Sequence, residues 1–427
     1  MITGTLIIYA SVADQAAPLA AVRITVQDES GTVVSRLTTD STGATTALSL
    51  PAPDARYSLD EDNRTVRPYS IYRLTAESEG WQSQILEGVQ VFADQQTVAR
   101  LSFLPVAQDG SLTPANAGGE TVTTIPPHVL FAGNGGSGPT PEETLSPRVL
   151  TEVVIPKQIT VHLGAPTASA TNVTVGFQDY IANVASSEVY PTWPEEALRA
   201  NILAQISLAL NRIWTEWYPS RGYAFNITGS PSYDQAYVSG RTVFAVMEKL
   251  TAELFNTYVR RSGDQEPYFT EYCDGKLVTC PGMKQWGTVD RANEGKNALQ
   301  ILRYYYGDRV QLATTNNIAS IPSSWPGVTL KRGSTGTSVS ILQRQLSRIA
   351  KDYPAFGKPE VTGTFDATTE QAVKNFQKQF SLTADGLVGK ATWYKISFIY
   401  VSVKDLAELT SEGETATGTE SSGSWPG

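Results

Sequence analysis

Histidine is scarce in this sequence: 427 residues contain only two, His128 and His162. A zinc hydrolase needs two or three imidazoles on one ion, and a Ser-His-Asp site needs one imidazole beside its nucleophile. His128 lies in a stretch rich in Gly, Pro and Thr, so neither arrangement is expected. The sequence therefore predicts no metal and no cofactor, and it favours carboxylates as the groups that carry any catalysis.

The chain also lacks an excess of positive charge and any long apolar run. It has 33 Lys and Arg against 42 Asp and Glu, for a net charge of −9 at pH 7, which argues against a nucleic-acid partner. No segment reaches the roughly 18 consecutive apolar residues of a membrane helix. The start of the chain lacks the basic and apolar regions of a secretion signal. We expect no membrane span and no signal peptide.

Changes in composition along the chain predict a multidomain protein. At roughly 150 residues per domain, this length leaves room for about three. Residues 1–106 alternate apolar, β-branched and polar positions between Asp- and Gly-containing turns, which predicts an all-β sandwich. Residues 107–149 are rich in Gly, Pro, Thr and Ser, which predicts a flexible linker. Such a linker is either a simple spacer or a target for a protease.

The second half of the chain contains two further predicted domains and a tail. Residues 150–327 combine strand-like segments with apolar stripes typical of helices over about 194–217 and 241–260, so we expect an α+β domain. Residues 328–409 carry amphipathic segments separated by Gly turns, which predicts a small three-helix domain. Its 11 basic and 7 acidic side chains suit an anionic polymer. Residues 410–427 are predicted to be disordered.

The C-terminal domain resembles the peptidoglycan-binding domain type 1 family. Matching segments occur in the family's order and spacing: LKRGS at 330–334, VSILQRQL at 339–346, GTF at 363–365, TEQAVKNFQ at 369–377 and DGLVGKATW at 385–393. This resemblance implies that peptidoglycan glycan strands are the partner.

The middle domain resembles the lytic transglycosylase domain of the stage II sporulation protein D family. Two blocks carry the resemblance, SEVYPTWPEEALRAN at 187–201 and GMKQWG at 282–287. With its flanking domains, the chain looks like the spore cortex-lytic proenzymes of anaerobic spore formers, and the run YIANVASSEVYPTWP at 180–194 is the most specific part of the match. An arginine of the sporulation family is missing from the helix after Arg199, Lys284 replaces a serine, and the family's zinc ligands have no clear counterpart.

Cleavage of a glycosidic bond needs a protonated carboxyl whose pKa is raised by a partly apolar pocket. Glu188 is predicted to lie in a loop before a helix, among apolar and aromatic neighbours that would favour the neutral acid. The resemblance implies a reaction that needs this carboxyl alone, because the C6 hydroxyl of muramic acid attacks its own anomeric carbon and leaves a 1,6-anhydro end. Five further residues are predicted to bind substrate: Tyr190, Arg199, Asp234, Gln285 and Trp286.

Cys273 and Cys280 are the only cysteines, and the Asp-Gly between them suits a hairpin. A disulfide is the first prediction. The alternative is a metal site that His162 would have to join.

The sequence leaves two function classes open. The first is a lytic transglycosylase, and the second is a wall-binding protein without enzyme activity. The family resemblance implies a proenzyme cut by a serine protease near residues 146–154, with residues 1–106 as a pro-domain. It also implies a spore-associated location, in the cortex or on the coat side, with a vegetative cytoplasmic pool as the alternative.

Overall fold

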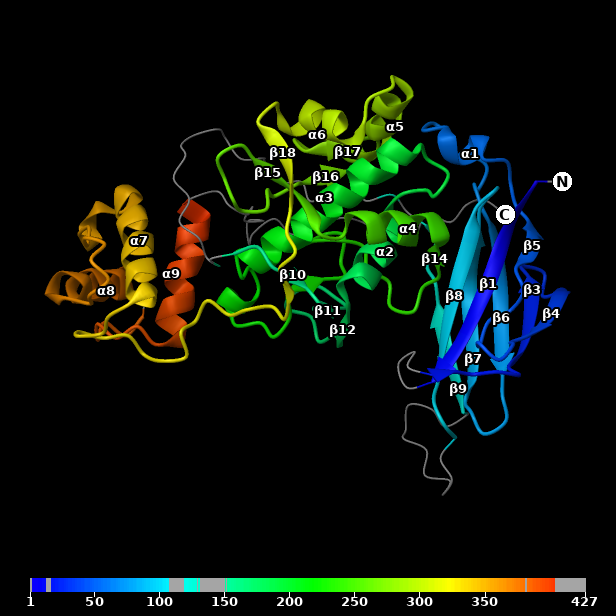
Figure 1. Ribbon diagram of the computed structural model, residues 1–427, viewed down its shortest axis with the longest axis horizontal. Helices are drawn as coiled ribbons and strands as arrows, with labels where there is room; N and C mark the ends of the chain where they lie inside the picture. Colours follow the sequence, from blue (N-terminus) through cyan, green and yellow to red (C-terminus); the bar gives the residue numbers. More distant parts are fainter. Residues whose placement is uncertain are drawn as a thin grey trace.

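The architecture comes from a computed structural model, and the structure describes residues 2–12, 17–106, 119–128, 130, 150, 152–380 and 382–403. A β-rich part, a central mixed part and a small helical part follow one another along the longest axis of the molecule (Figure 1). Among the described residues, none of the helices combines the length and apolarity needed to cross a bilayer.

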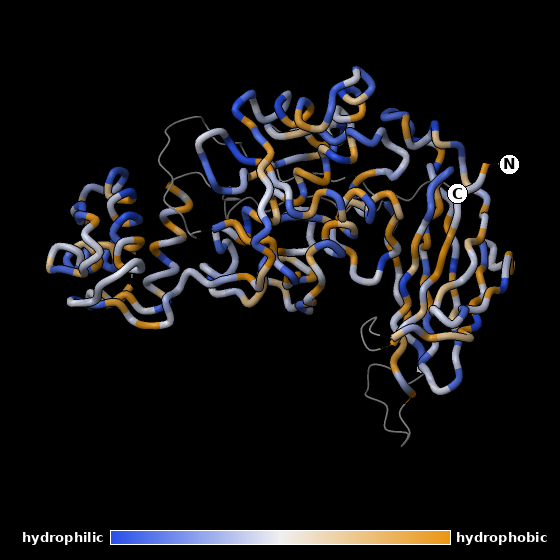
Figure 2. Tube along the Cα trace, viewed as in Figure 1, coloured by the Kyte–Doolittle hydropathy of each residue, from blue (hydrophilic) through white to orange (hydrophobic). Residues whose placement is uncertain are grey.

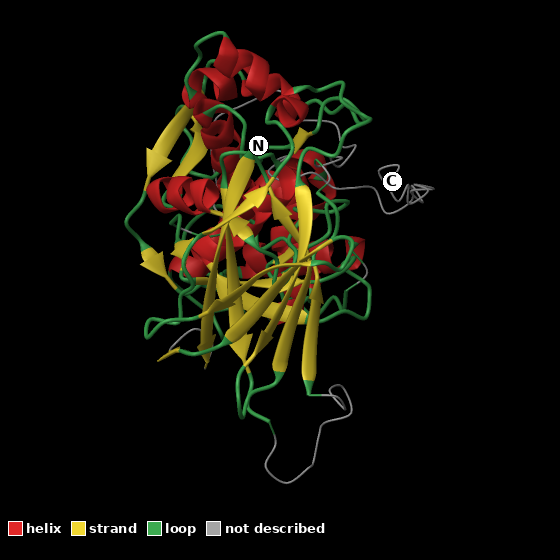
Figure 3. Ribbon diagram, turned by 90° about the vertical axis from the view of Figure 1, so that its right-hand side faces the viewer, coloured by secondary structure: helices red, strands yellow, loops and turns green. Residues whose placement is uncertain are grey.

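The N-terminal part contains two sheets: β8, β1, β2 and β5 form the first, to which β14 (Val243–Phe244) of the central part adds a fifth strand, and β4, β3, β6, β7 and β9 form the second. Burial alternates along β1, as the period of a half-buried strand requires, and it turns Leu6, Ile8 and Ala10 into the core. Figure 3 shows these strands in front of the helices, and Figure 2 shows apolar residues along them. The bounds are β1 (Thr3–Val12), β2 (Ala17–Pro18), β3 (Arg23–Asp28), β4 (Val33–Thr38), β5 (Leu48–Pro51), α1 (Arg56–Leu59), β6 (Ser70–Glu77), β7 (Ser83–Val91), β8 (Gln96–Phe103) and β9 (Glu120–Thr124).

The linker prediction for residues 107–149 is wrong over one segment. Residues 120–124 form β9, which pairs in parallel with β7 at the edge of one sheet. The Thr-rich sequence carries no apolar alternation, because this edge strand exposes most of its side chains. Residues 107–118 and 131–149 lie outside the described residues.

The central part combines helices with short strands. Its elements are β10 (Ile155–Pro156), β11 (Gln158–His162), β12 (Asn172–Gly176), α2 (Phe177–Glu188), α3 (Glu195–Trp214), η2 (Pro219–Arg221), β13 (Ile227–Thr228), β14 (Val243–Phe244), α4 (Ala245–Leu254), β15 (Thr257–Arg261), β16 (Tyr272–Cys273), β17 (Met283–Lys284), α5 (Gln285–Asn293), α6 (Ala298–Tyr306), β18 (Val310–Thr314) and β19 (Ile318–Ala319). α3 is buried along almost its whole length. A helix with this burial is the central element of a domain.

The helix predicted over residues 241–260 is shorter in the structure. β14 precedes α4, and the segment after α4 becomes strand β15. β14 pairs with β8 of the N-terminal part, so a strand of the central part extends the first sheet. β15 pairs with β18, with Thr257 opposite Thr314 and Arg261 opposite Val310. Both pairings depend on distant segments, which helical spacing cannot reveal.

Three helices form the C-terminal part, as the sequence predicts: α7 (Thr337–Asp352), α8 (Ala367–Gln379) and α9 (Lys390–Val403), with a short helix η3 (Pro354–Phe356). Asp366 caps α8 by accepting a hydrogen bond from the Thr369 backbone N–H, which satisfies one of the unpaired donors of the first turn. The core of these helices also contains Trp217, Tyr218 and Phe225 from the central part. Residues 410–427, predicted to be disordered, lie outside the described residues.

Candidate active site

Glu188 is the last residue of α2 and is completely buried. The sequence places it in a loop, but the helix continues to this residue and ends at Val189, whose extended backbone starts the connection to α3. Glu188 is therefore held by helix α2, and its carboxyl points toward Gln205 in the middle of α3.

Three donors reach the Glu188 carboxyl from three different segments. The Ala236 backbone N–H donates to Oε1 at 2.8 Å, and the Tyr272 hydroxyl and Gln205 Nε2 donate to Oε2 at 2.8 and 2.7 Å. Gln235 joins this network, because its Nε2 donates to the Tyr272 hydroxyl and to the Gln205 carbonyl. These contacts fix the orientation of the carboxyl.

Burial raises the pKa of Glu188 to about 7, although the hydrogen bonds from Ala236, Tyr272 and Gln205 act to lower it. Desolvation exceeds the three hydrogen bonds because an ionised carboxylate without solvent is costly. The result is a carboxyl poised to exchange a proton near neutral pH, the property that a general acid requires.

We expect glycan cleavage that depends on protonated Glu188 to be present below pH 7 and lost as the pH rises through about 7. In Tyr272→Phe one hydrogen bond that lowers the pKa of Glu188 is removed, so this limb of the pH profile moves to higher pH. Tyr306→Phe is the control, because the Tyr306 hydroxyl donates to the Glu271 carbonyl instead. Profiles of initial rate against pH for the three proteins test this, and a limb that stays in place in Tyr272→Phe contradicts it.

The GMKQWG block at 282–287 lies beside Tyr272, because Met283 pairs with Tyr272 between β17 and β16. A Cβ at Gly282 would lie 2.0 Å from the Glu271 carbonyl oxygen, so only glycine fits this close approach. Gln285, predicted to hold an N-acetyl group, is completely buried at the start of α5. It therefore presents no surface to a sugar in this conformation.

Tyr190 and Trp286, predicted to contact sugar, belong to a buried cluster instead. We call this group the interface aromatic cluster: Tyr69, Phe92, His128, Tyr190, Trp193, Phe244 and Trp286. The Tyr190 ring lies 5.7 Å from Phe92 and 4.8 Å from His128, both outside the central part. Tyr190 is 7% and Trp286 6% exposed, so neither offers a free face for stacking.

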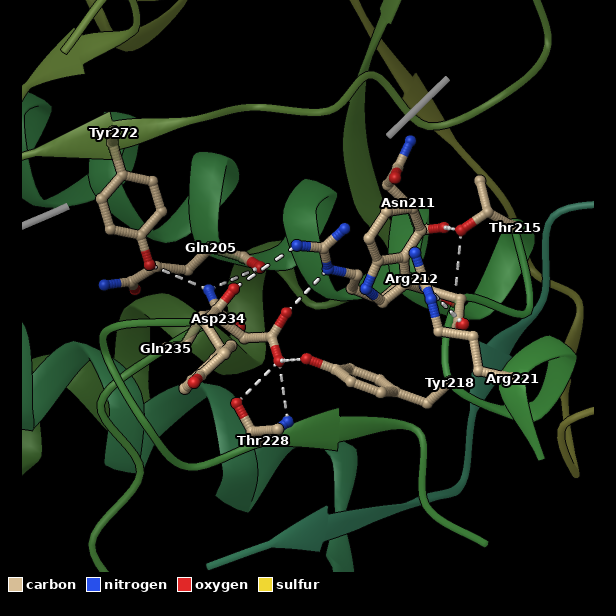
Figure 4. A network of polar contacts seen from close by, with 12 residues as sticks. Gln205, Asn211, Arg212, Thr215, Tyr218, Arg221, Thr228, Asp234, Gln235 and Tyr272 are labelled. Carbon is tan, nitrogen blue, oxygen red and sulfur yellow. Dashed lines mark hydrogen bonds and ion pairs between the residues drawn. The ribbon is translucent and has the colours of Figure 1, made fainter. Parts of the chain in front are cut away.

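Asp234, predicted to bind substrate, is engaged within the protein in this structure. It is completely buried, and its oxygens accept hydrogen bonds from Arg212 Nε at 2.7 Å, the Tyr218 hydroxyl, and the backbone N–H and hydroxyl of Thr228 (Figure 4). A carboxylate surrounded in this way holds the fold together, and it has no free oxygen for a sugar.

Arg199 is also engaged elsewhere. Its guanidinium pairs with Glu195 on the preceding turn of α3, at 2.7 Å, and with Glu253 on α4. These two ion pairs give Arg199 a structural role that joins α3 to α4.

Cys273 and Cys280 form a disulfide. It closes the segment that follows Tyr272, which donates to Glu188. The three donors to Glu188 were not found by the sequence analysis. Gln205 gave one signal in the sequence, as a polar residue within the apolar stripe over about 194–217, whereas Tyr272 and Ala236 gave none.

Comparison with protein families identifies a known family in the central part and another in the C-terminal part. The stage II sporulation protein family matches residues 167–258, and a peptidoglycan binding domain matches residues 335–396. The chain contains both domains. The sporulation domain covers α2, α3 and α4, and with them Glu188, Gln205 and Asp234, while the GMKQWG block lies beyond it.

Two curated relatives share short regions with the chain. N-acetylmuramoyl-L-alanine amidase CwlL of Bacillus licheniformis is 33% identical over 81 residues, 19% of this chain and 22% of the relative. Zinc D-Ala-D-Ala carboxypeptidase of Streptomyces albus G is 40% identical over 74 residues, 17% of this chain and 27% of the relative. The chain thus spans about a quarter of the length of each.

A solved structure, the N-terminal domain of SleB, is 31% identical and covers 19% of this chain and 99% of its own, with a TM-score of 0.16.

Proposed function

We propose that the protein is a peptidoglycan lytic transglycosylase, in which Glu188 protonates the leaving oxygen of the MurNAc-GlcNAc bond and then acts as the base. The single observation that supports this most is the buried carboxyl with a pKa near 7, held by three donors within the sporulation domain. The peptidoglycan binding domain in the same chain supports a glycan substrate.

The surroundings of Glu188 favour a mechanism with one carboxyl. Glycoside hydrolases usually use two carboxylates, one of which activates water or attacks the sugar. Asp234, another buried carboxylate of the same domain, is already bound by Arg212, Tyr218 and Thr228. Attack by the C6 hydroxyl of muramic acid needs no second carboxylate, because the nucleophile belongs to the substrate. Detection of 1,6-anhydro-muramic ends by mass spectrometry of the released fragments tests this proposal.

A wall-binding protein without enzyme activity is the second candidate. The observation that favours it is the complete burial of Glu188, since a glycan cannot contact the carboxyl in this arrangement. The two candidates differ in the products they leave. A pure binder retains peptidoglycan and releases no anhydro ends, even after the N-terminal part has been removed.

The contacts of the α2–α3 connection support the proposal that the protein is made as a proenzyme. The Trp193 indole N–H donates to the Ser58 carbonyl at 3.0 Å, and the Ser58 and Thr192 hydroxyls lie 2.7 Å apart. Tyr190 packs on Phe92 in the interface aromatic cluster. Helix α1 and the residue after β7 thus contact the segment that directly follows Glu188. The proposed serine-protease site near 146–154 falls mostly outside the described residues.

We further propose that the substrate is the spore cortex, degraded during germination, and that the protein is spore-associated. This rests on the domain combination and on the sequence resemblance to cortex-lytic proenzymes. Immunodetection in fractionated spores and vegetative cells tests the location, and a signal confined to the vegetative cytoplasm would contradict it.

A further inference from the structure

Arg241 is a buried cation at the boundary between the N-terminal and central parts, and it is only 7% exposed. Its Nε donates to the Thr242 carbonyl at 3.1 Å, and its Nη2 donates to Gln90 Oε1 on β7 at 3.2 Å. Among the described residues, no carboxylate pairs with this guanidinium. Burial lowers the pKa of Arg241 to about 10, so the side chain stays charged at neutral pH. The boundary therefore contains a positive charge that nothing neutralises, which is costly for a folded protein.

The groups of the N-terminal part around Arg241 are neutral. Gln90 offers an amide oxygen, and burial raises the pKa of Tyr69 above that of an ordinary phenol. Burial also lowers the pKa of His128 well below its usual range, and the Arg241 charge adds to this effect. In the described part of the chain, neither ring nitrogen of His128 has a hydrogen-bond partner. The N-terminal part thus covers the cation without pairing it, and it leaves polar atoms of its own unsatisfied.

Aromatic rings of the central part lie at the same boundary. The Trp193 ring lies 6.0 Å from Tyr190 and 4.8 Å from Trp286. His128 is close both to these rings and to the cation, because its ring lies 4.8 Å from that of Tyr190 and its imidazole feels the Arg241 charge. Aromatic faces beside a free guanidinium are suited to a sugar that carries a carboxylate.

The segment that carries Arg241 also holds the candidate catalytic carboxyl. It starts at Ala236, whose backbone N–H donates to Glu188 Oε1 at 2.8 Å. The Val238 backbone N–H then donates to Asn183 Oδ1 on α2 at 3.0 Å. Asn183 precedes Glu188 by five residues on α2, which is about 7.5 Å along the helix. The segment therefore follows α2 away from Glu188, and the arginine lies three residues after its contact with Asn183.

Removal of the N-terminal part would release one end of the Arg241 side chain and keep the other in place. Nη2 would lose Gln90, whereas Nε would keep the Thr242 carbonyl. The backbone nearby stays attached to α2, because the Phe244 N–H donates to Ser186 Oγ at 3.2 Å. A guanidinium held in this way is ready to pair with a carboxylate from outside the chain.

We propose that the boundary surface of the central part, formed by Arg241 and the rings of Tyr190, Trp193 and Trp286, binds a carboxylate-bearing stretch of peptidoglycan once the N-terminal part has left. The carboxylate belongs either to the lactyl group of unsubstituted muramic acid or to a stem peptide, and the two present the same group to the arginine. The inference rests on the proposed function, because it takes peptidoglycan as the ligand and the N-terminal part as removable.

The test uses the full chain with Glu188→Gln, so that no glycan is cleaved, and with the recognition sequence of a specific protease inserted within residues 131–149. The chain is cut after it has folded, and binding is measured by calorimetry before and after the cut. The first probe is a tetrasaccharide of alternating N-acetylglucosamine and N-acetylmuramic acid, and the second carries L-Ala-D-Glu on its lactyl groups. Tetra-N-acetylglucosamine is the neutral probe. We expect the cut to raise the affinity for a carboxylate probe about tenfold or more, and to raise that for the neutral probe less.

Variants of the arginine separate its charge from the rings. Arg241→Met should remove the preference for carboxylate probes in the cut protein, and Arg241→Lys should retain part of it. Arg309→Met is the control, because the Arg309 guanidinium donates to the Ser262 carbonyl within the central part. The peptidoglycan binding domain is present before and after the cut, so its own binding cancels in the comparison. Which carboxylate probe loses affinity in Arg241→Met identifies the lactyl group or the stem peptide as the source.

Equal affinity for carboxylate and neutral probes in the cut protein, or an unchanged preference in Arg241→Met, overturns the proposal. If the two parts stay together after the cut, a carboxylate probe should separate them in gel filtration and the neutral probe should not. Parts that no probe separates and that show no gain in affinity also overturn it. Thermal melting verifies the fold of each variant. Because the readout is binding, a failure here is distinct from the absence of anhydro ends, which tests the proposed reaction.

Discussion

Glu188→Gln is expected to lower the release of 1,6-anhydro-muramic ends by a factor of about 10² to 10⁴, the usual contribution of a positioned general acid. The amide keeps the size of the side chain but cannot transfer a proton to the leaving oxygen. Protonation and later deprotonation both depend on this group in the proposed mechanism. The loss should therefore appear in kcat, with little change in the amount of peptidoglycan bound.

Glu196→Gln is the matched control for this experiment. Glu196 lies in the first turn of α3, and its carboxylate accepts a hydrogen bond from the Ala298 backbone N–H at 2.6 Å. An amide oxygen can accept the same bond, so activity should be retained. Reducing-end analysis and mass spectrometry of digested peptidoglycan measure both variants. If Glu188→Gln releases as many anhydro ends as the unaltered protein, Glu188 is not the acid.

The sequence could identify Glu188 but not the groups that tune it. Its position follows from a local motif, SEVYPTW, that resembles a known family. Its donors lie 17, 48 and 84 residues away in the chain. Only tertiary packing brings them together, so no spacing pattern in the sequence could indicate that Gln205, Ala236 and Tyr272 converge.

The binding residues show a different limit. Arg199 and Asp234 have the right chemistry for a sugar, but each found an opposite charge inside the protein. A single sequence does not reveal whether a charged side chain is already paired. Tyr190 and Trp286 were expected to contact substrate, but both are buried, and Tyr190 packs on Phe92 of the N-terminal part as well as on Trp286. The sequences of the N-terminal and central parts do not show which of their residues contact each other.

Removing residues before Val153 is expected to raise specific activity on peptidoglycan about tenfold or more. The N-terminal part contributes Phe92 to the interface aromatic cluster, and the Ser58 carbonyl of α1 accepts the Trp193 hydrogen bond. Without this part, the segment between α2 and α3 loses these contacts and can move away from Glu188. A tenfold gain corresponds to about 1.4 kcal/mol, a small part of what such an interface supplies. Equal activity of the full-length and trimmed proteins would contradict a pro-domain role.

A point variant tests the same idea without removing a domain. Glu61 in the N-terminal part pairs with Lys276 of the central part at 2.6 Å, and both side chains are about one third exposed. Exposed pairs contribute roughly 0.2–1 kcal/mol, so Glu61→Lys should loosen the interface and raise basal activity about two- to fivefold. Glu77→Lys is the control, because Glu77 pairs with Arg23 within the N-terminal part. Adding Lys276→Glu to Glu61→Lys restores opposite charges across the interface and should return activity to its original level. A rise that is equal in Glu77→Lys, or that the double variant does not reverse, would show that this interface does not restrain the enzyme.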